Sequence, residues 1–271
     1  MAKNMTTKHR FPPIDERLLL QSVSRALDVL EVFSQDPEPK SLGEIAAAAG
    51  INKSAAQRIS QTLLSRGYLE QAERGGLTLG RQFLDRSFDY LRANPLIEKA
   101  VPILNDLRKT TGERVDLSLF DAEHDNLSVV YALRMQSKRE RFYATLAGRR
   151  MPSLVATGGR ACLALLDDEV IHDIMAHADL KPITPKTRLE PERIWEKIRE
   201  ARRDGYAFQE EEALLGEVAL AAAIRNHAGQ PVGAVHIAGS LSEWSSEEFR
   251  KRFCPLAIEA ARALSAWKSN I

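Results

Sequence analysis

Apolar residues recur at helical spacing through the first part of the chain. Three segments show this pattern and are predicted to be helices, at 21–34, 41–49 and 53–66. Ser41 stands three residues before Glu44, which is the pattern of a capping box, and Gly50 and Gly67 stand where the second and third helices should stop. Two strand-like runs with a glycine-rich turn between them follow, at 68–70 and 77–79. The predicted order is helix, helix, short turn, helix, hairpin.

A further helical segment, 81–92, is followed by Asn94-Pro95, and the residue before a proline is disfavoured in a helix. We expect this segment to connect two domains, because the pattern changes after it. Strand-like runs are found at 115–120, 127–133, 143–146, 218–225 and 232–238. Helical patterns are found at 96–110, 157–166, 168–176, 191–204 and 246–266. Strands mixed with helices on a mostly antiparallel sheet predict an α+β domain.

Composition narrows the class of protein. The chain has 271 residues, of which 44% are hydrophobic and 28% charged, so we expect a folded protein of about two domains. The 38 basic and 37 acidic residues leave a net charge of +1, so any contact with DNA must come from a local patch. No run approaches the roughly 20 apolar residues that span a bilayer. Residues 1–17 are polar and basic, and we expect a disordered tail rather than a signal peptide, in a cytoplasmic protein.

The third predicted helix carries such a patch. No acidic residue occurs within 45–69, and Ser54, Gln57 and Arg58 share one side of the helix, away from its apolar stripe. In the major groove, Gln and Arg can bond adenine and guanine edges, while Lys and Ser can hold phosphates. Base contacts are expected from Gln57 and Arg58, and mainly phosphate contacts from the others. The predicted DNA-binding residues are Lys53, Ser54, Gln57, Arg58 and Arg74.

Two alternatives remain open for this region. Its polar helix face can be a solvated surface of a small protein-interaction module. The second half of the chain can also be a metabolite sensor that signals through protein contacts and has no function on DNA.

Several segments resemble, in order and spacing, the IclR family of bacterial transcriptional regulators. These segments are QSVSRALDVLEVFS, SLGEIAAAAGINKSAAQRISQTLLSRGYLE, LTLG, MPSLVATGGRACLALL, GYAFQEEEALLGEVALAAAI and GQPVGAVHIAGSLS. The resemblance covers nearly the whole chain after residue 20. It implies a winged helix-turn-helix, a linker helix and a GAF-like domain that binds a small organic acid, in a homodimer or homotetramer that represses or activates transcription. The expected boundaries are 1–19 for the tail, 20–80 for the winged helix-turn-helix, 81–95 for the linker helix and 96–271 for the effector-binding domain.

The resemblance also implies an effector site. By place within the motifs, its residues are Tyr143, Thr157, Gly158, Gln209, Glu210, Ala219, His236 and Ala238. Thr157 and Gly158 begin a predicted helix, whose free N–H groups can receive a carboxylate. Family members that bind the smallest acids tend to have hydroxyl residues at positions 236 and 238 and a thiol at position 219. This sequence therefore favours a larger acid, such as an aromatic carboxylate, with His236 as a donor. A buried histidine with a purely structural role is the alternative.

An enzyme is not expected. The chain has no G-x-S-x-G, Walker-type or H-E-x-x-H motif, and helix entry with close packing explains Gly158-Gly159 as well as a nucleotide cradle does. His172 and His177 are five residues apart, which does not place both on one helix face, so no metal site is predicted. No cofactor is predicted either.

Three further groups of residues have a plain structural interpretation. Cys162 and Cys254 are expected to be buried free thiols. The acidic triplet 210–212 is expected in a solvated loop, although one of its carboxylates can face the pocket. The basic run 134–150 is expected to be a solvated edge, and the alternative is that it steers anionic ligands to the domain.

A single winged helix reads too short a site for useful specificity, so two copies on a near-palindromic operator are expected. Apolar residues on the first helix and on the linker helix are the candidates for a two-fold contact. In the linker helix these are Phe83, Leu84, Phe88 and Leu91. Packing within their own domain is the alternative.

Overall fold

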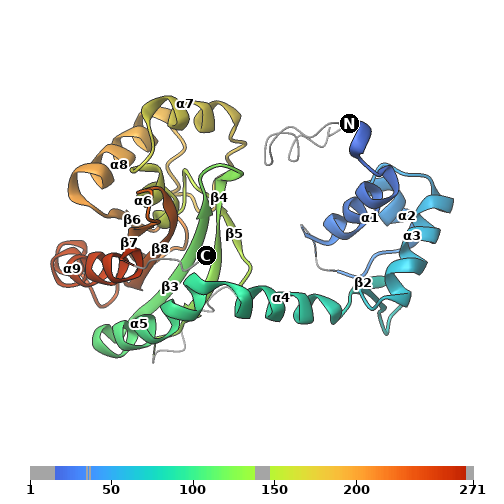
Figure 1. Ribbon diagram of the computed structural model, residues 1–271, viewed down its shortest axis with the longest axis horizontal. Coiled ribbons are helices and arrows are strands. Elements are labelled where there is room, and N and C mark those ends of the chain that lie inside the picture. The colour runs from blue at the N-terminus through green and yellow to red at the C-terminus, as the bar shows by residue number, and fades with distance from the viewer. Residues whose placement is uncertain (1–15, 35, 37, 138–146, 267–271) are drawn as a thin grey trace. The chain divides into compact units, whose positions relative to one another are not determined.

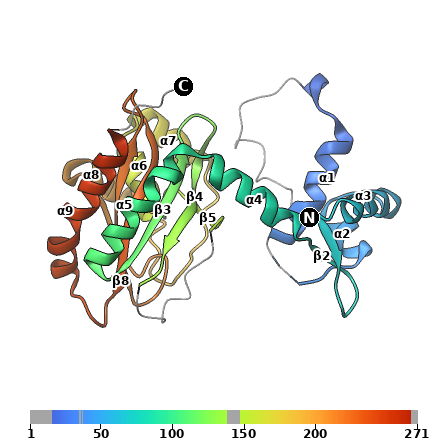
Figure 2. The same cartoon turned by 60° about the horizontal axis from the view of Figure 1, so that its bottom comes forward.

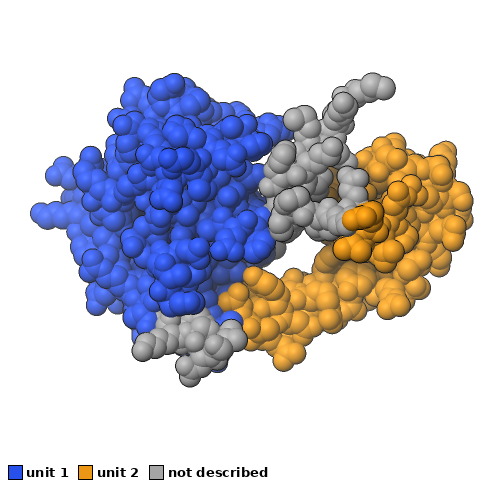
Figure 3. Space-filling model, turned by 45° about the horizontal axis from the view of Figure 1, so that its top comes forward, with its two compact units in different colours: residues 1–12, 95–271 blue, residues 13–94 orange. Residues whose placement is uncertain are grey.

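The computed structural model describes residues 16–34, 36, 38–137 and 147–266. Its contacts divide the chain into two compact units, residues 13–94 and residues 95–271, which Figure 3 colours separately. The labels used below are those of Figure 1. None of the helices in the described ranges combines the length and the hydropathy of a membrane-spanning segment.

Two helices of the first unit, α2 and α3, begin at a residue whose side chain caps the helix. The helices of this unit are η1 (Glu16–Leu18), α1 (Gln21–Glu31), η2 (Val32–Ser34), α2 (Leu42–Ala48) and α3 (Lys53–Ser65). Ser41 and Glu44 form the predicted capping box at the start of α2. The Asn52 side chain caps α3, because its Oδ1 accepts a hydrogen bond of 2.8 Å from the Ala55 N–H. Gly50 has a φ of 65°, which allows the tight turn between the two helices.

A short hairpin completes the unit. Its strands β1 (Leu69–Gln71) and β2 (Leu77–Leu79) pair antiparallel. The apolar stripes of the helices meet in one core, formed by Val29, Phe33, Ile45, Ala46, Ala56, Leu63, Leu69 and Leu77. The next helix, α4 (Gln82–Ala93), is described throughout and has no buried residue, although the Phe83 ring packs edge-on against Tyr68 at a centroid distance of 5.4 Å.

A six-stranded sheet organises the second unit. Its strand order is β5-β4-β3-β8-β7-β6, and every neighbouring pair is antiparallel. The strands are β3 (Arg114–Asp121), β4 (Asp125–Met135), β5 (Arg150–Pro152), β6 (Ala207–Glu210), β7 (Glu217–Arg225) and β8 (Pro231–Ser240). The helices are α5 (Pro95–Thr111), α6 (Thr157–Leu163), α7 (Asp168–His177), α8 (Pro191–Asp204) and α9 (Ser246–Ser265).

Two glycines identify the helices that cover each face of this sheet. A Cβ on Gly239 would lie 2.6 Å from the Phe249 ring, so α9 packs on the face that holds Ile237. A Cβ on Gly158 would lie 2.4 Å from the His236 ring. Because successive side chains of a strand point to opposite faces, α6 packs on the other side of the sheet. Helix α5 lies beside α9 (Figure 2).

The predicted α+β fold class is confirmed. Most predicted elements differ from the observed ones by one to three residues at their ends. The sequence pattern does not predict β5 or β6, which have three and four residues, because alternation is weak over so short a run and no glycine-rich turn marks them as it marks β1 and β2. The strand expected at 143–146 lies outside the described residues.

Candidate DNA-binding helix and effector site

Four of the five residues predicted to contact DNA lie together at the start of α3. Lys53, Ser54, Gln57 and Arg58 are all exposed. The opposite side of the helix is buried in the core of its unit. The first turn also leaves backbone N–H groups that no helical carbonyl pairs, and such groups favour phosphate. The helix can therefore present long polar side chains to base edges while its first turn faces the backbone of DNA.

Arg74 lies in the turn between β1 and β2 and is exposed. The two residues after it, Gly75 and Gly76, have φ values of 88° and 84°, which glycine adopts without strain. This tight turn places Arg74 at the tip of the hairpin, in the same unit as α3.

Four residues predicted for the effector site share one face of the sheet. Gln209 lies opposite Ala219 in the next strand, and Ala219 lies opposite Ala238 in the strand after that. His236 shares this face and lies opposite Ala221. We call this surface the α6 face, because α6 packs on it. The α6 face includes Arg114, Asp116, Ser118, Tyr131, Arg134, Gln209, Glu217, Ala219, Ala221, Ala234, His236, Ala238 and Ser240.

Gln209 is the polar residue of the α6 face that lies on the edge strand. Its side chain is buried, and its Oε1 has no hydrogen-bond partner within the described part of the chain. Beside it, Ala219 and Ala238 add little side-chain volume to this face, because their side chains end at Cβ. Buried polar atoms in native proteins are generally paired with protein, water or a ligand. The Gln209 amide is therefore placed to bind a further group on this face.

Thr157 and Gly158 begin α6 and are buried. Gly158 lies directly on the His236 ring and on the Ser118 hydroxyl, which a Cβ would approach to 2.8 Å. A Cβ on Gly159 would lie 2.2 Å from the Ser153 carbonyl oxygen. The interpretation of both glycines as close packing is confirmed.

His236 is enclosed on several sides. Its Nε2 lies 2.7 Å from the Ser118 Oγ, and its ring centroid lies 5.0 Å from that of Tyr131. Burial, with the nearby guanidinium groups of Arg134 and Arg114, lowers the pKa of His236 to about 3. The ring is therefore neutral at physiological pH.

A buried network of charges lies next to His236. Asp116 accepts hydrogen bonds from Arg114 at 3.0 Å and from Arg134 at 3.1 Å, both at Oδ2. Arg114 Nη1 lies 2.7 Å from Glu217 Oε2. Burial alone would lower the pKa of Arg114, but the two carboxylates outweigh it and raise the pKa above its usual value. Burial raises the pKa of Glu217 against the influence of Arg114.

This network of buried charges was not predicted from the sequence. The expectation of a solvated edge at 134–150 is wrong for Arg134, whose side chain is 8% exposed. Residues 138–146 of that run, including Tyr143, lie outside the described residues. A signal was available, because Arg114, Asp116 and Ser118 alternate with apolar residues along one strand. That pattern indicates a polar face on a strand.

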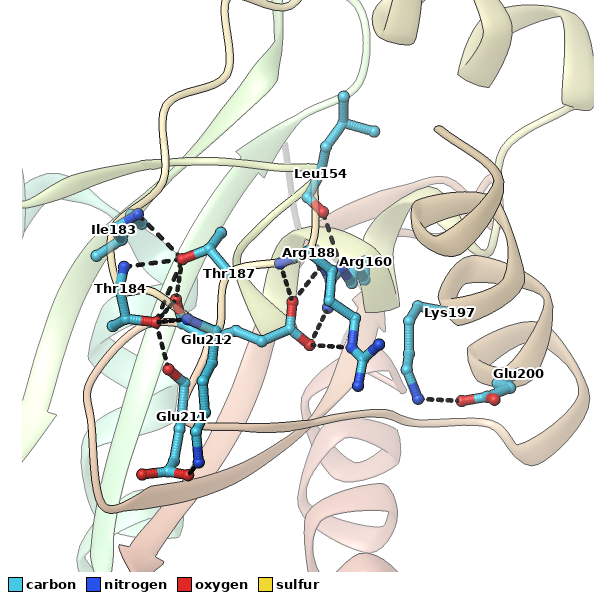
Figure 4. Close-up of polar contacts among 11 residues, drawn as sticks. Leu154, Arg160, Ile183, Thr184, Thr187, Arg188, Lys197, Glu200, Glu211 and Glu212 are labelled. Carbon is cyan, nitrogen blue, oxygen red and sulfur yellow. Dashed lines mark hydrogen bonds and ion pairs between the residues drawn. The ribbon is translucent and has the colours of Figure 1, made fainter. Parts of the chain in front are cut away.

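The acidic triplet 210–212 divides between surface and interior. Glu210 is exposed and points away from Gln209 on the other side of β6. Glu212 is buried, so the expectation of a solvated loop is wrong for it. Its Oε1 and Oε2 accept hydrogen bonds of 3.0 and 2.8 Å from the two Nη atoms of Arg160 (Figure 4). This paired contact joins α6 to the loop after β6.

The cysteines differ from each other. Cys162 is buried as expected, burial raises its pKa, and its thiol donates to the Gly233 carbonyl at 3.2 Å. Cys254 is only partly buried, so the expectation is wrong for it.

Comparison with known proteins assigns both units. Residues 22–73 match the IclR helix-turn-helix domain, and residues 88–266 match the C-terminal domain of the bacterial transcriptional regulator IclR. The chain is 27% identical over 247 residues to the transcriptional repressor IclR of Escherichia coli, covering 91% of this chain and 89% of that protein. It is 26% identical over 247 residues to the p-hydroxybenzoate hydroxylase transcriptional activator of Acinetobacter baylyi, with 90% of each chain covered.

A solved structure gives the same result at the level of the fold. It is an IclR homologue from Microbacterium hydrocarbonoxydans, solved as a complex with 4-hydroxybenzoate. The TM-score is 0.72 at 20% identity, covering 90% of this chain and 98% of the other. Since the two domain matches together span most of the chain, the protein belongs to the IclR family of bacterial transcriptional regulators.

Proposed function

We propose that this regulator binds a near-palindromic operator through α3 and the hairpin tip, and that a small organic acid bound by the second unit controls that binding. The exposed polar start of α3 carries the DNA proposal. Gln57 and Arg58 read bases, while Lys53, Ser54 and Arg74 hold phosphates. The protein acts in the cytoplasm on a catabolic operon and catalyses no reaction.

The effector site in this proposal lies on the α6 face. The ligand is in contact with Gln209, Ala219, His236 and Ala238 of the sheet. Thr157 and Gly158, at the start of α6, cover it on the helix side. The unpaired Oε1 of buried Gln209 beside the alanines supports this placement. Glu210 is left out, because it is exposed on the other side of its strand.

The proposed effector class is an aromatic carboxylate. One relative is named for p-hydroxybenzoate hydroxylase, and one homologue was crystallised with 4-hydroxybenzoate. Alanines at positions 219, 221 and 238 give a flat apolar surface that suits a planar ring. Because His236 is neutral, its imidazole offers an uncharged contact surface to such a ring.

A homodimer is proposed as the smallest active form, with a tetramer as two such dimers. Large apolar side chains of α1 and α4 support an interface there. The exposed fractions are 52% for Val23, 54% for Leu27, 71% for Leu84 and 65% for Phe88. Large exposed apolar side chains are candidates for interaction sites, here on each of the two helices. Phe83 of α4 is a weaker candidate, because its ring packs on Tyr68.

A gel-shift assay with DNA from upstream of the protein's own gene, with and without added acids, tests the proposal. Benzoate-like and glyoxylate-like acids are first ranked by thermal shift. A ligand at 100 times its Kd adds about 2.7 kcal/mol to the stability of a protein that binds it only when folded. The proposal expects a specific DNA complex whose midpoint changes with a stabilising acid. A complex that ignores every stabilising acid contradicts the regulatory part, and failure to shift any DNA contradicts the whole.

A further inference from the structure

The ion pair between Arg134 and Asp116 uses only one of the two hydrogen bonds that such a pair can form. A guanidinium presents Nε–H and one Nη–H side by side on one edge, and a carboxylate can accept both in a fork. Here Nη2 donates to Asp116 Oδ2 at 3.1 Å. Nε of Arg134 and Oδ1 of Asp116 have no hydrogen-bond partner within the described residues. The two side chains are 8% and 1% exposed, so this open donor and open acceptor lie in the interior.

Neighbouring contacts keep the Arg134–Asp116 pair in this arrangement with a single hydrogen bond. Asp116 Oδ2 is shared, because Arg114 Nε also donates to it at 3.0 Å. The guanidinium carbon of Arg134 lies 4.5 Å from the centroid of the Tyr131 ring. A buried donor and a buried acceptor that stay unpaired destabilise the folded protein, so a bound group that pairs both is favoured.

The chemistry of the two open atoms selects the group that fits. It must donate to a carboxylate oxygen and accept from an N–H. A hydroxyl does both with one oxygen atom. A carboxylate cannot donate, and it would meet the negative charges of Asp116 and Glu217. An ammonium cannot accept from Nε.

We propose that Asp116 and Arg134 form a hydroxyl-selecting subsite of the effector site, so that the effector carries a hydroxyl in addition to its acid group. The inference rests on the proposed effector site. Asp116 lies directly opposite His236 in the neighbouring strand, about 5 Å away along the sheet. A ligand on the alanines of the α6 face therefore reaches the pair with its far end. Asp116 and Arg134 thus act as specificity-determining residues.

Calorimetry on the full chain tests the subsite with acids that differ by one hydroxyl. The probes are 4-hydroxybenzoate and 3-hydroxybenzoate against benzoate, and lactate against propionate, with phenol as a neutral probe. We expect at least one hydroxy acid to bind tenfold or more tightly than its partner. Arg134→Lys keeps the charge and removes the Nε donor, and it should reduce this ratio below threefold. Asp116→Asn should reduce the ratio as well.

Arg202→Lys is the matched control, because Arg202 also forms an ion pair, with Asp168 at 2.8 Å, but away from the α6 face. It should leave the ratio unchanged, and circular dichroism checks that each variant is folded. Acids that bind with ratios below threefold in wild type overturn the subsite and leave the proposed function standing. An unchanged ratio in folded Arg134→Lys also overturns it. Binding of phenol alone, weakened by Arg134→Lys, supports the subsite and contradicts acid sensing. Binding of no probe contradicts both.

Discussion

Nε2 of His236 and Oγ of Ser118 lie 2.7 Å apart inside the second unit, beneath Gly158, which has no side chain to displace them. Both residues are buried, and the histidine shares its surroundings with two guanidinium groups. Protonating this ring in the folded protein would place a third positive charge there. The pair therefore links the stability of the effector domain to pH.

Acidification is predicted to destabilise the second unit through His236. Its pKa is about 3 in the folded protein against 6.5 in the unfolded chain, so between these values the unfolded state binds more protons and stability falls as pH falls. From pH 7 to pH 5 the loss is roughly 2 kcal/mol, at about 1.4 kcal/mol per pH unit below 6.5. Urea denaturation of wild type and His236→Asn at both pH values measures it. An equal loss in the two proteins would show that another group carries the effect.

Removing only one partner of the Arg160–Glu212 ion pair is predicted to destabilise the fold strongly. Arg160→Met removes the paired guanidinium from buried Glu212 and leaves it only the longer contacts to Arg188, at 3.3 and 3.9 Å, so it should lower the free energy of unfolding by about 3–5 kcal/mol. The double variant Arg160→Met/Glu212→Leu should recover part of this loss. The exposed pair Arg193–Glu196 is the control, and Arg193→Met should change the free energy of unfolding far less. A double variant less stable than Arg160→Met would contradict the account.

A charge on the exposed surface of α4 is predicted to prevent assembly. Phe88→Asp should shift the mass from light scattering at micromolar concentration towards that of a monomer, because a carboxylate would be buried in the proposed interface. Arg86→Glu lies on the opposite side of the helix and should leave the mass unchanged. A wild-type protein that is monomeric with and without DNA would refute the interface.

Lys53→Ala is predicted to weaken binding to all DNA sequences alike. A lost phosphate contact lowers the slope of log affinity against log salt by about one for each copy of the residue in the complex. Titrations at several salt concentrations on an operator and an unrelated duplex give both slopes. Loss of affinity for the operator alone would instead assign Lys53 to base readout.

Local features of this fold could be predicted from the sequence, and distant pairings could not. The capping box of Ser41 and Glu44 and the stop at Gly50 depend on neighbours within a few residues. The partners Arg160 and Glu212 are 52 residues apart, and nothing near either residue indicates the other. Arg134 was expected to be solvated for the same reason, since its partner Asp116 lies in the adjacent strand. Burial of a charge depends on its partner, and the partner is set by the sheet register.

The start of α3 is proposed to read DNA, and fluorescence anisotropy on the operator measures this reading. A duplex from upstream of the gene is compared with variants that carry single base changes, using wild type and Arg58→Ala. We expect Arg58→Ala to lose about 1–3 kcal/mol of binding free energy on the operator and to stop discriminating at one base position. Unchanged affinity and unchanged discrimination in the folded variant would contradict the assignment of α3 as the reading helix.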